Sequence, residues 1–121
     1  RNKKDLNSAI KEIQKLRKEF YKSVKVTGDQ FSFNESLAKA LRVADFLELG
    51  ELFAVDALSR NESCGGHFRE EYQTKEGEAL RNDDDYRFVS AWEYNENIEQ
   101  SKLHKEHLDF ESVELKNRSY K

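Results

Sequence analysis

Apolar residues recur every three or four positions in the first part of the chain. From Lys3 to about Val26, Lys and Glu occupy most of the positions between them, and the apolar residues are Leu6, Ile10, Ile13, Leu16, Phe20 and Val24. This spacing predicts a helix with one apolar stripe. We expect Gly28 to end the helix in a left-handed conformation, which glycine adopts at little cost.

A second helix is predicted from about Asn34 to Asn61, with Asn34 as its N-cap and Glu35 in its first turn. Its apolar residues cover well over half of the helix circumference, so it needs at least two packing partners, and the first helix supplies only one. Gly50 costs about 1 kcal/mol relative to alanine, and it either admits a close neighbour or is tolerated. The apolar residues are Leu37, Leu41, Ala44, Leu47, Val55 and Leu58 on one side, widened by Ala40, Val43, Phe46, Leu49, Phe53 and Ala57.

The pattern changes after Ser63. Gly65 and Gly66 break the helix, and residues 67–85 form a charged connector. Residues 86–94 then alternate between apolar and polar positions, which predicts a strand with one face formed by Tyr86, Phe88, Trp92 and Tyr94.

A polar turn is expected at residues 95–101, followed by a second strand from about His107. Its apolar residues switch parity near Glu111 and Ser112, which predicts a bulge there. The two strands are expected to pair as an antiparallel ribbon. The apolar residues that switch parity are Leu108, Phe110, Val113 and Leu115.

Composition limits the chain of 121 residues to one domain at most, divided here into a helical portion, 1–63, and a tail, 64–121. Aromatic residues make up 12%, which is too many for a disordered chain. Cys64 is the single cysteine, so no intrachain disulfide forms, and no apolar run reaches membrane-spanning length. The chain contains no Met and begins with Arg1, and we expect it to be part of a longer protein.

Charge is distributed unevenly. Residues 1–26 carry nine Lys/Arg against three Asp/Glu, a net charge of +6, and residues 27–63 carry three against seven, a net charge of −4. No aromatic stacking platform accompanies the lysines, so nucleic-acid binding is disfavoured. The preferred interpretation is that the basic first helix complements the acidic second helix within the chain.

His67 and Arg69 allow two interpretations. They can clamp a substrate carboxylate, because arginine binds carboxylates through two parallel hydrogen bonds. The preferred alternative is a salt-bridge cluster with Glu62, Glu70 and Glu71, because no nucleophile or cofactor motif accompanies the pair.

Other candidate sites are weaker. Zinc binding would need four ligands from Cys64, His67, His104 and His107, and neither pair is a strong signature. Residues 83–85 are three consecutive aspartates without the spacing of a calcium loop, and we expect a solvated acidic turn. The spacing of Cys64 and His67 across a Gly-Gly turn gives no evidence of the geometry that a catalytic dyad requires. No glycine-rich phosphate-binding loop occurs, so the sequence shows no catalytic, cofactor-binding or metal-binding residues.

Several separated strings occur in the order found in one known family. They are Arg1–Leu6 with Ala9-Ile10, residues 44–52, Asp56–Leu58, Glu62-Ser63, Gly65, His67 with Arg69-Glu70, and the ending 117–121. In these strings the chain resembles the C-terminal region of the flavoprotein subunit of succinate dehydrogenase and fumarate reductase. L-aspartate oxidase shares a related string, but the ending resembles the succinate dehydrogenase subtype that has a diheme membrane anchor.

The resemblance implies a mainly α fold with two long antiparallel helices, part of a spectrin-repeat-like three-helix bundle whose first helix is missing, and an irregular tail with a short β-ribbon. It also implies a parent enzyme that interconverts succinate and fumarate through FAD and passes electrons to an iron–sulfur subunit and quinone. The parent would lie in the cytoplasm, on the inner face of the membrane, held by partner subunits, without direct membrane insertion.

The chain itself is then a structural domain that buttresses the flavin-binding domain and is inert alone. The residues expected to dock between domains are Glu62, Ser63, Gly65, Gly66, His67, Arg69, Glu70, Glu71 and Arg81. The alternative is a stand-alone helical module that dimerises through the exposed face of the second helix, and we expect the chain by itself to self-associate in either case.

Overall fold

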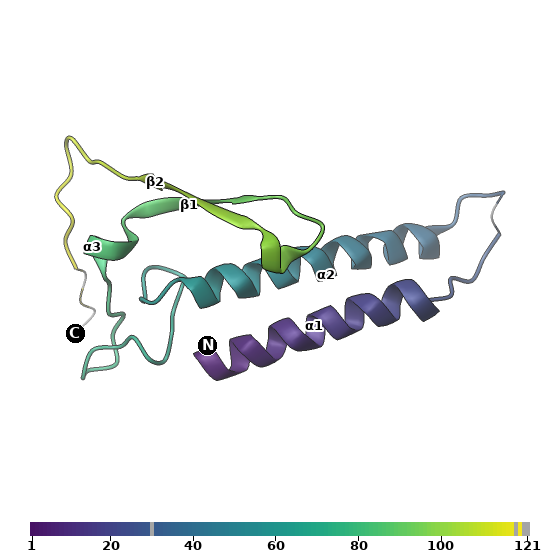
Figure 1. The fold of residues 1–121 in the computed structure, drawn as a ribbon, viewed down its shortest axis with the longest axis horizontal. Coiled ribbons are helices and arrows are strands. Elements are labelled where there is room, and N and C mark those ends of the chain that lie inside the picture. The colour runs from purple at the N-terminus through teal and green to yellow at the C-terminus, as the bar shows by residue number, and fades with distance from the viewer. Residues whose placement is uncertain (30, 118, 120–121) are drawn as a thin grey trace. The chain divides into compact units, whose positions relative to one another are not determined.

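A computed structural model describes residues 1–29, 31–117 and 119. The fold is mainly helical, with two long helices and a short two-stranded antiparallel sheet (Figure 1). The chain divides into two compact units, which are considered separately. The helical unit is Lys4–Ser59, and the tail unit combines Arg1–Lys3 with Arg60–Lys121.

Two antiparallel helices form the helical unit. Helix α1 spans Lys3–Ser23 and helix α2 spans Glu35–Ser59 (Figure 1). Their small core lies near the start of α1, where Leu6 packs with Ala54 and Ala57 of α2, and Ile10 and Leu58 border it. Neither described helix is both long and apolar enough to cross a membrane.

A buried carboxylate lies in the same helix pair. Glu51 of α2 is only 2% exposed, and it accepts hydrogen bonds from Arg17 Nη1 at 2.6 Å and Gln14 Nε2 at 2.9 Å. Arg17 also lies 3.9 Å from Glu48. Among the described residues of α1, Arg17 alone forms an ion pair with the acidic residues of α2. Of the charge complementarity predicted between the two helices, the described residues show only the contacts of Arg17 with Glu51 and Glu48.

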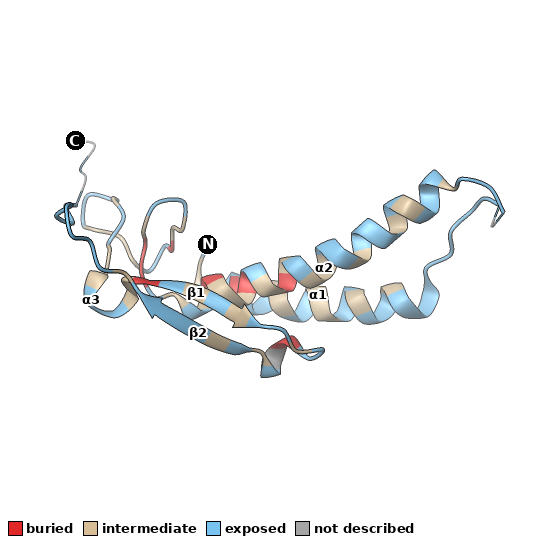
Figure 2. Ribbon diagram, turned by 90° about the horizontal axis from the view of Figure 1, so that it is seen from above, coloured by how far each residue is buried: buried red, intermediate tan, exposed pale blue. Residues whose placement is uncertain are grey.

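The apolar surface of α2 exceeds what α1 covers. Its buried residues lie in the second half of the helix (Figure 2). Phe46 and Phe53 are 66% and 68% exposed, and Val43 and Leu49 are also exposed. These four residues are called the apolar face of α2. Their exposure agrees with the expectation that α2 needs a second packing partner.

The first helix ends earlier than the sequence pattern predicted. Helix α1 stops at Ser23, whose hydroxyl donates to Glu19 O, so Val24–Val26 are not helical. Gly28 is therefore not the residue that ends the helix, although its φ is +121°. It lies beside Asn34, which is the predicted N-cap of α2. Asn34 Oδ1 accepts from Leu37 N at 3.0 Å, and Asn34 Nδ2 donates to Thr27 O at 3.1 Å.

We expect Gly28→Ala to lower the free energy of unfolding by about 1–3 kcal/mol, because the positive φ disfavours a side chain. The new Cβ would also lie 2.4 Å from Asn34 Nδ2 and disturb the N-cap. Gly50→Ala is the matched control, since its Cβ would lie 4.0 Å from Ile13 and alanine favours the helix, so it should stabilise by about 0.5–1 kcal/mol. Thermal unfolding followed by circular dichroism distinguishes them, and equal effects would contradict this assignment.

A two-stranded ribbon belongs to the tail unit. Strand β1, Phe88–Glu93, pairs antiparallel with strand β2, Lys102–His107, through a connection containing the 3₁₀ helix η1, Ile98–Gln100. The ribbon and the intervening polar turn were predicted. Phe88 and Trp92 face the less exposed side, whereas Tyr86 lies in the short helix α3, Asp83–Tyr86, and Tyr94 lies beyond the strand.

The predicted position of the second strand is wrong. Pairing begins directly after η1, with Lys102 opposite Glu93, and ends with His107 opposite Phe88. The pairing register fixes this strand, even though its sequence is mostly polar. The described residues that follow His107 form no strand, so the parity switch at Glu111 and Ser112 marks no bulge.

Candidate functional site

The motif loop, residues 62–72, begins with a tight turn. Cys64 and His67 exchange backbone hydrogen bonds of 2.8 and 3.0 Å across Gly65 and Gly66. Gly65 has a φ of +57°, as the first central residue of a type II′ turn requires. Both glycines are exposed, and a Cβ at either would meet no atom within 4 Å. The glycine pair therefore forms an open tip.

Beneath the tip, Ser63 and Arg69 fix the two sides of the loop. Ser63 is completely buried, and its Oγ accepts from Arg69 N at 2.8 Å and donates to Arg69 O at 3.2 Å. Ser63 N donates to Leu80 O at 2.9 Å, and Leu80 N donates to Tyr72 O at 3.1 Å. The serine hydroxyl is thus used to hold backbone and is not positioned as a nucleophile.

The guanidinium of Arg69 is the most buried charge of the loop. Arg69 is 1% exposed, and it donates from Nε to Glu71 at 3.2 Å and from Nη1 to Arg60 O at 3.3 Å. It also lies 5.4 Å from the ring centroid of Tyr72. His67 Nε2 lies 3.1 Å from the same carbonyl oxygen of Arg60. Arg69 and His67 therefore converge on backbone, which leaves neither in position to clamp a substrate carboxylate.

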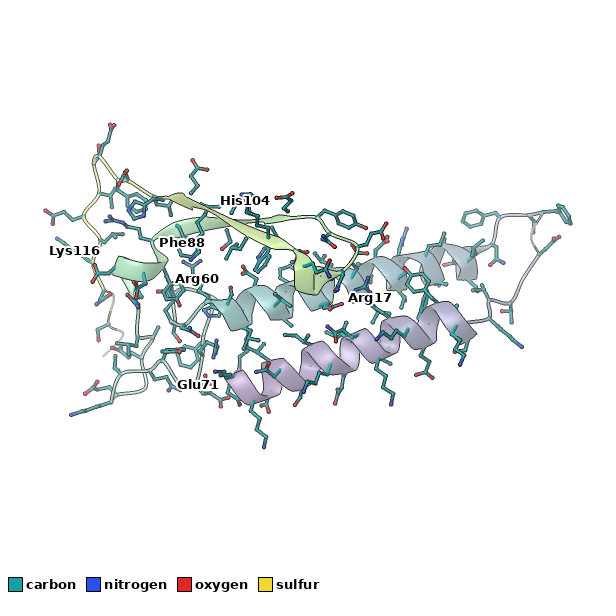
Figure 3. All side chains as sticks on the ribbon, viewed as in Figure 1. Arg17, Arg60, Glu71, Phe88, His104 and Lys116 are labelled. Carbon is teal, nitrogen blue, oxygen red and sulfur yellow. The ribbon has the colours of Figure 1, made fainter. Side chains whose placement is uncertain are left out.

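Glu62 occupies a second buried position. It is 2% exposed and accepts from Arg60 Nε at 2.7 Å and from the backbone N of Asn82 at 2.9 Å. Arg60 also donates to Tyr86 O, and its guanidinium lies 5.2 Å from the ring centroid of Phe88 (Figure 3). Glu62 thus connects the motif loop to α3 and the ribbon.

The remaining predicted residues lie around this network. Arg81 binds Asp83 Oδ1 at 2.6 Å through Nη2 and donates to Lys116 O at 3.2 Å. The bond to Asp83 raises the pKa of Arg81 above its ordinary value. Glu70 is exposed and accepts from Asn2 Nδ2 at 3.0 Å, and Glu70 N donates to Arg1 O at 2.8 Å.

The predicted salt-bridge cluster is confirmed for Arg69 with Glu71, but Glu62 and Glu70 have other partners. Arg69 pairs with Glu71, whereas Glu62 pairs with Arg60. Sequence reasoning missed Arg60 and Asn82, as well as the contacts that residues 1–3 make with Glu70 and Glu71. The one sequence signal was the short Arg60-x-Glu62 spacing. Contacts between residues nearly 70 positions apart leave no signal of this kind.

Glu71 has the most perturbed carboxylate of the loop. The backbone N–H of Lys3 and, next, the guanidinium of Arg69 donate to it, and together they lower its pKa from the ordinary 4.5 to about 2. Both bonds favour the ionised carboxylate.

This pKa predicts acid sensitivity of the tail unit. The stabilisation by Glu71 should be complete above about pH 4.5 and should be lost as the pH falls toward about 2. Glu71→Gln should therefore remove part of the acid dependence of the unfolding free energy, measured by denaturant titrations across this range. Glu106→Gln, at an exposed position on β2, is the control. Identical acid dependence in the native chain and Glu71→Gln would contradict the prediction.

Other groups bond to the histidines of the zinc hypothesis. Within the ranges that the structure describes, no three His, Cys, Asp or Glu side chains form a cluster suited to a metal ion. His104 bonds to Glu93 at 2.7 Å, and His107 bonds to Arg87 at 2.9 Å. Asp83–Tyr86 form α3, capped by the side chain of Asn82, as expected for an acidic turn before the strand.

The glycine pair of the motif loop does not fit the pyrophosphate of FAD. A dinucleotide pyrophosphate is usually bound where a glycine-rich turn opens a helix. Gly65 and Gly66 instead connect Cys64 to His67 within a hairpin turn, and no helix begins there. No chemical step through FAD is therefore assigned to this chain.

One protein family matches almost the whole chain. The family described as fumarate reductase flavoprotein C-term matches residues 1–120. The chain belongs to this family, the C-terminal domain of the succinate dehydrogenase and fumarate reductase flavoprotein. Neither the curated proteins nor the solved structures contain a match. Of the family-like ending 117–121, Arg118, Tyr120 and Lys121 lie outside the described residues.

Proposed function

We propose that this chain serves as a structural domain of its flavoprotein and docks against the flavin-binding domain through the tip of the motif loop. The observation that carries this proposal is the contrast between the buried base of the loop and its exposed tip. Glu62, Ser63 and Arg69 are buried and bonded within the tail unit, whereas Gly65 and Gly66 are exposed. The buried residues fix the base of the loop, and the tip is open to solvent. A tip that is held in place in this way suits recognition of a protein surface.

The parent enzyme would interconvert succinate and fumarate. FAD would be held by the flavin-binding domain and not by this chain, and it would supply the hydride chemistry. Electrons would continue to an iron–sulfur subunit and quinone at the inner face of the membrane. Family membership supports these assignments, and we infer that the chain alone neither binds FAD nor reduces fumarate.

The reading frame upstream of Arg1 provides the first test. A frame that encodes a glycine-rich dinucleotide-binding motif near its start would support the flavoprotein assignment. A stop codon immediately upstream would contradict it. The encoded flavin-binding domain then supplies the partner for a direct binding test.

Docking is tested by titrating the flavin-binding domain with this chain in a calorimeter. Gly66→Arg should weaken binding at least tenfold, because Gly66 lies at the open tip where a side chain has room but would block a partner. Ala91→Arg, at an exposed position on β1, is the matched control and should bind normally. Equal binding by all three chains would exclude docking through the tip.

A second role follows from the apolar face of α2, which is Val43, Phe46, Leu49 and Phe53. These side chains are exposed on a helix that has one packing partner in its unit. We propose that a further helix of the parent flavoprotein covers them, completing a three-helix bundle. The alternative occupant is a second copy of the chain, as in a dimerisation module.

Sedimentation of the chain with and without its upstream segment separates these occupants. If the upstream segment supplies the missing helix, the isolated chain should self-associate and the extended chain should be monomeric. Phe46→Glu/Phe53→Glu should abolish the self-association of the isolated chain. Leu80→Glu, at an exposed apolar position outside the face, is the control. A dimer that persists in the extended chain would favour the dimerisation module.

A further inference from the structure

Arg87, between α3 and β1, has a guanidinium that is only partly used. Its Nη2 donates to His107 Nε2 at 2.9 Å, whereas its Nε is buried and has no hydrogen-bond partner among the described residues. Buried donors in folded proteins are nearly always bonded, so an unsatisfied one indicates a place where a water, an ion or a ligand binds. Within the ranges that the structure describes, Arg87 also forms no ion pair.

The two donors of Arg87 lie on one edge of the guanidinium. Two parallel hydrogen bonds from such an edge match the oxygens of a carboxylate or a phosphate. Arg81, in the same tail unit, uses this edge for a carboxylate, since its Nε and Nη2 donate to Asp83 Oδ1 at 3.1 and 2.6 Å. At Arg87, one histidine nitrogen bonds to Nη2 alone. An oxyanion in its place would satisfy both donors.

The residues around this edge add positive charge. His107 stands opposite Phe88 in the ribbon, and Lys105 shares the face of β2 that carries His107. Lys105 Nζ lies 4.4 Å from the ring centroid of Phe88. Asp109 Oδ1 lies 3.9 Å from His107 Nε2, but this exposed carboxylate forms no ion pair with Arg87. In the described part of the chain, Arg87 and Lys105 therefore have no carboxylate partner.

We propose that Arg87 and His107 form a binding site for a small oxyanion, which is a carboxylate or phosphate group. The oxyanion accepts from Nε and Nη2 of Arg87 and displaces His107 from Nη2. His107 is 55% exposed, so its ring has room to shift. In its other neutral tautomer, Nε2 of His107 carries the proton and donates to the same oxyanion. Because Arg87 Nε is buried, only a small group reaches it. The site belongs to the ribbon and is independent of docking through the motif loop.

The test follows the arginine Nε–H signals of the whole chain by proton–nitrogen NMR while sodium acetate or sodium phosphate is added at constant ionic strength. The signal of Arg87 should move and saturate with either salt. The signal of Arg81 should stay in place, because Asp83 already bonds to its edge. Saturation at Arg87 without a shift at Arg81 is the expected result.

Arg87→Lys keeps the charge but removes the paired donors, and it should weaken binding about tenfold, measured from the ring signals of His107. Its amide spectrum shows whether it is folded. Arg42→Lys, at an exposed position on α2, is the matched control and should bind as the native chain does. Equal binding by Arg87→Lys would overturn the proposal, as would a shift of Arg87 that does not saturate or that sodium chloride reproduces.

Asp109→Asn tests whether the chain supplies its own oxyanion. Without added salt, the Arg87 Nε–H signal of this variant should match that of the native chain. If the substitution changes this signal as much as a saturating ligand does, Asp109 occupies the edge in solution and the proposal falls. Comparison of the two salts identifies the ligand class, since tighter binding of acetate assigns the site to carboxylates and tighter binding of phosphate assigns it to phosphate groups.

Discussion

Replacing Arg69 with methionine is expected to lower the free energy of unfolding of the tail unit by about 2–4 kcal/mol. Methionine retains the apolar stem but removes the charge and the hydrogen bonds to Glu71 and Arg60 O. Glu71 then loses its cationic partner, and the two sides of the motif loop are held by the Ser63 hydroxyl and the backbone bonds between Cys64 and His67. The effect is large because Arg69 is almost completely buried.

Trp92 provides a specific readout for this prediction, since the single tryptophan lies on β1 in the tail unit. Urea unfolding followed by its fluorescence reports that unit separately from the helices. Arg81→Met is the matched control, because its pair with Asp83 is partly exposed and should contribute about 1 kcal/mol or less. Comparable losses from both variants would show that burial of Arg69 does not set its contribution.

Arg17→Met should destabilise the helical unit by about 2–4 kcal/mol. Glu51 would remain buried beside α1 with its ion-pair partner removed, and breaking one side of a buried pair is far more costly than removing both charges. Arg17→Met/Glu51→Leu should therefore recover most of the lost stability. The helical circular dichroism signal during thermal unfolding measures both effects.

Lys39→Met is the control for that pair of variants. Lys39 and Glu35 form an exposed pair four residues apart on α2, and such pairs contribute about 0.5 kcal/mol or less. If the double variant proved less stable than Arg17→Met, the buried pair would stabilise the fold beyond compensation of its own charges.

Local signals in the sequence explain which parts of the fold were predictable. The spacing of apolar residues specified both helices, and Asn34 specified the start of α2, because helix periodicity and capping depend on neighbouring residues. The second strand was misplaced because a strand depends on its partner. The polar segment Lys102–His107 pairs with β1, while the more apolar residues after it do not.

The candidate site shows the same limit. Ser63, Arg69 and Glu71 were identified from their density and from the family resemblance, but their docking role remains a prediction. The pair of Arg69 with Glu71 was among those predicted. The bonds of Arg69 to Arg60 O, of Glu71 to the backbone N of Lys3 and of Glu62 to Asn82 N could not be predicted, because only tertiary folding brings these backbone groups to the side chains. Backbone groups carry no residue-specific signal, so the sequence indicated only side-chain partners for Arg69, namely Glu62, Glu70 and Glu71, of which Glu71 is the one observed.

The bonds between residues 1–3 and the motif loop also bear on the order of folding. Arg1 and Glu70 are 69 positions apart, so closing that loop in an unfolded chain is entropically costly. The antiparallel hairpin of α1 and α2 replaces most of this loop with local contacts and returns the chain toward its starting point. The hairpin should therefore form early, and the tail unit should follow as the slower, topologically dependent step.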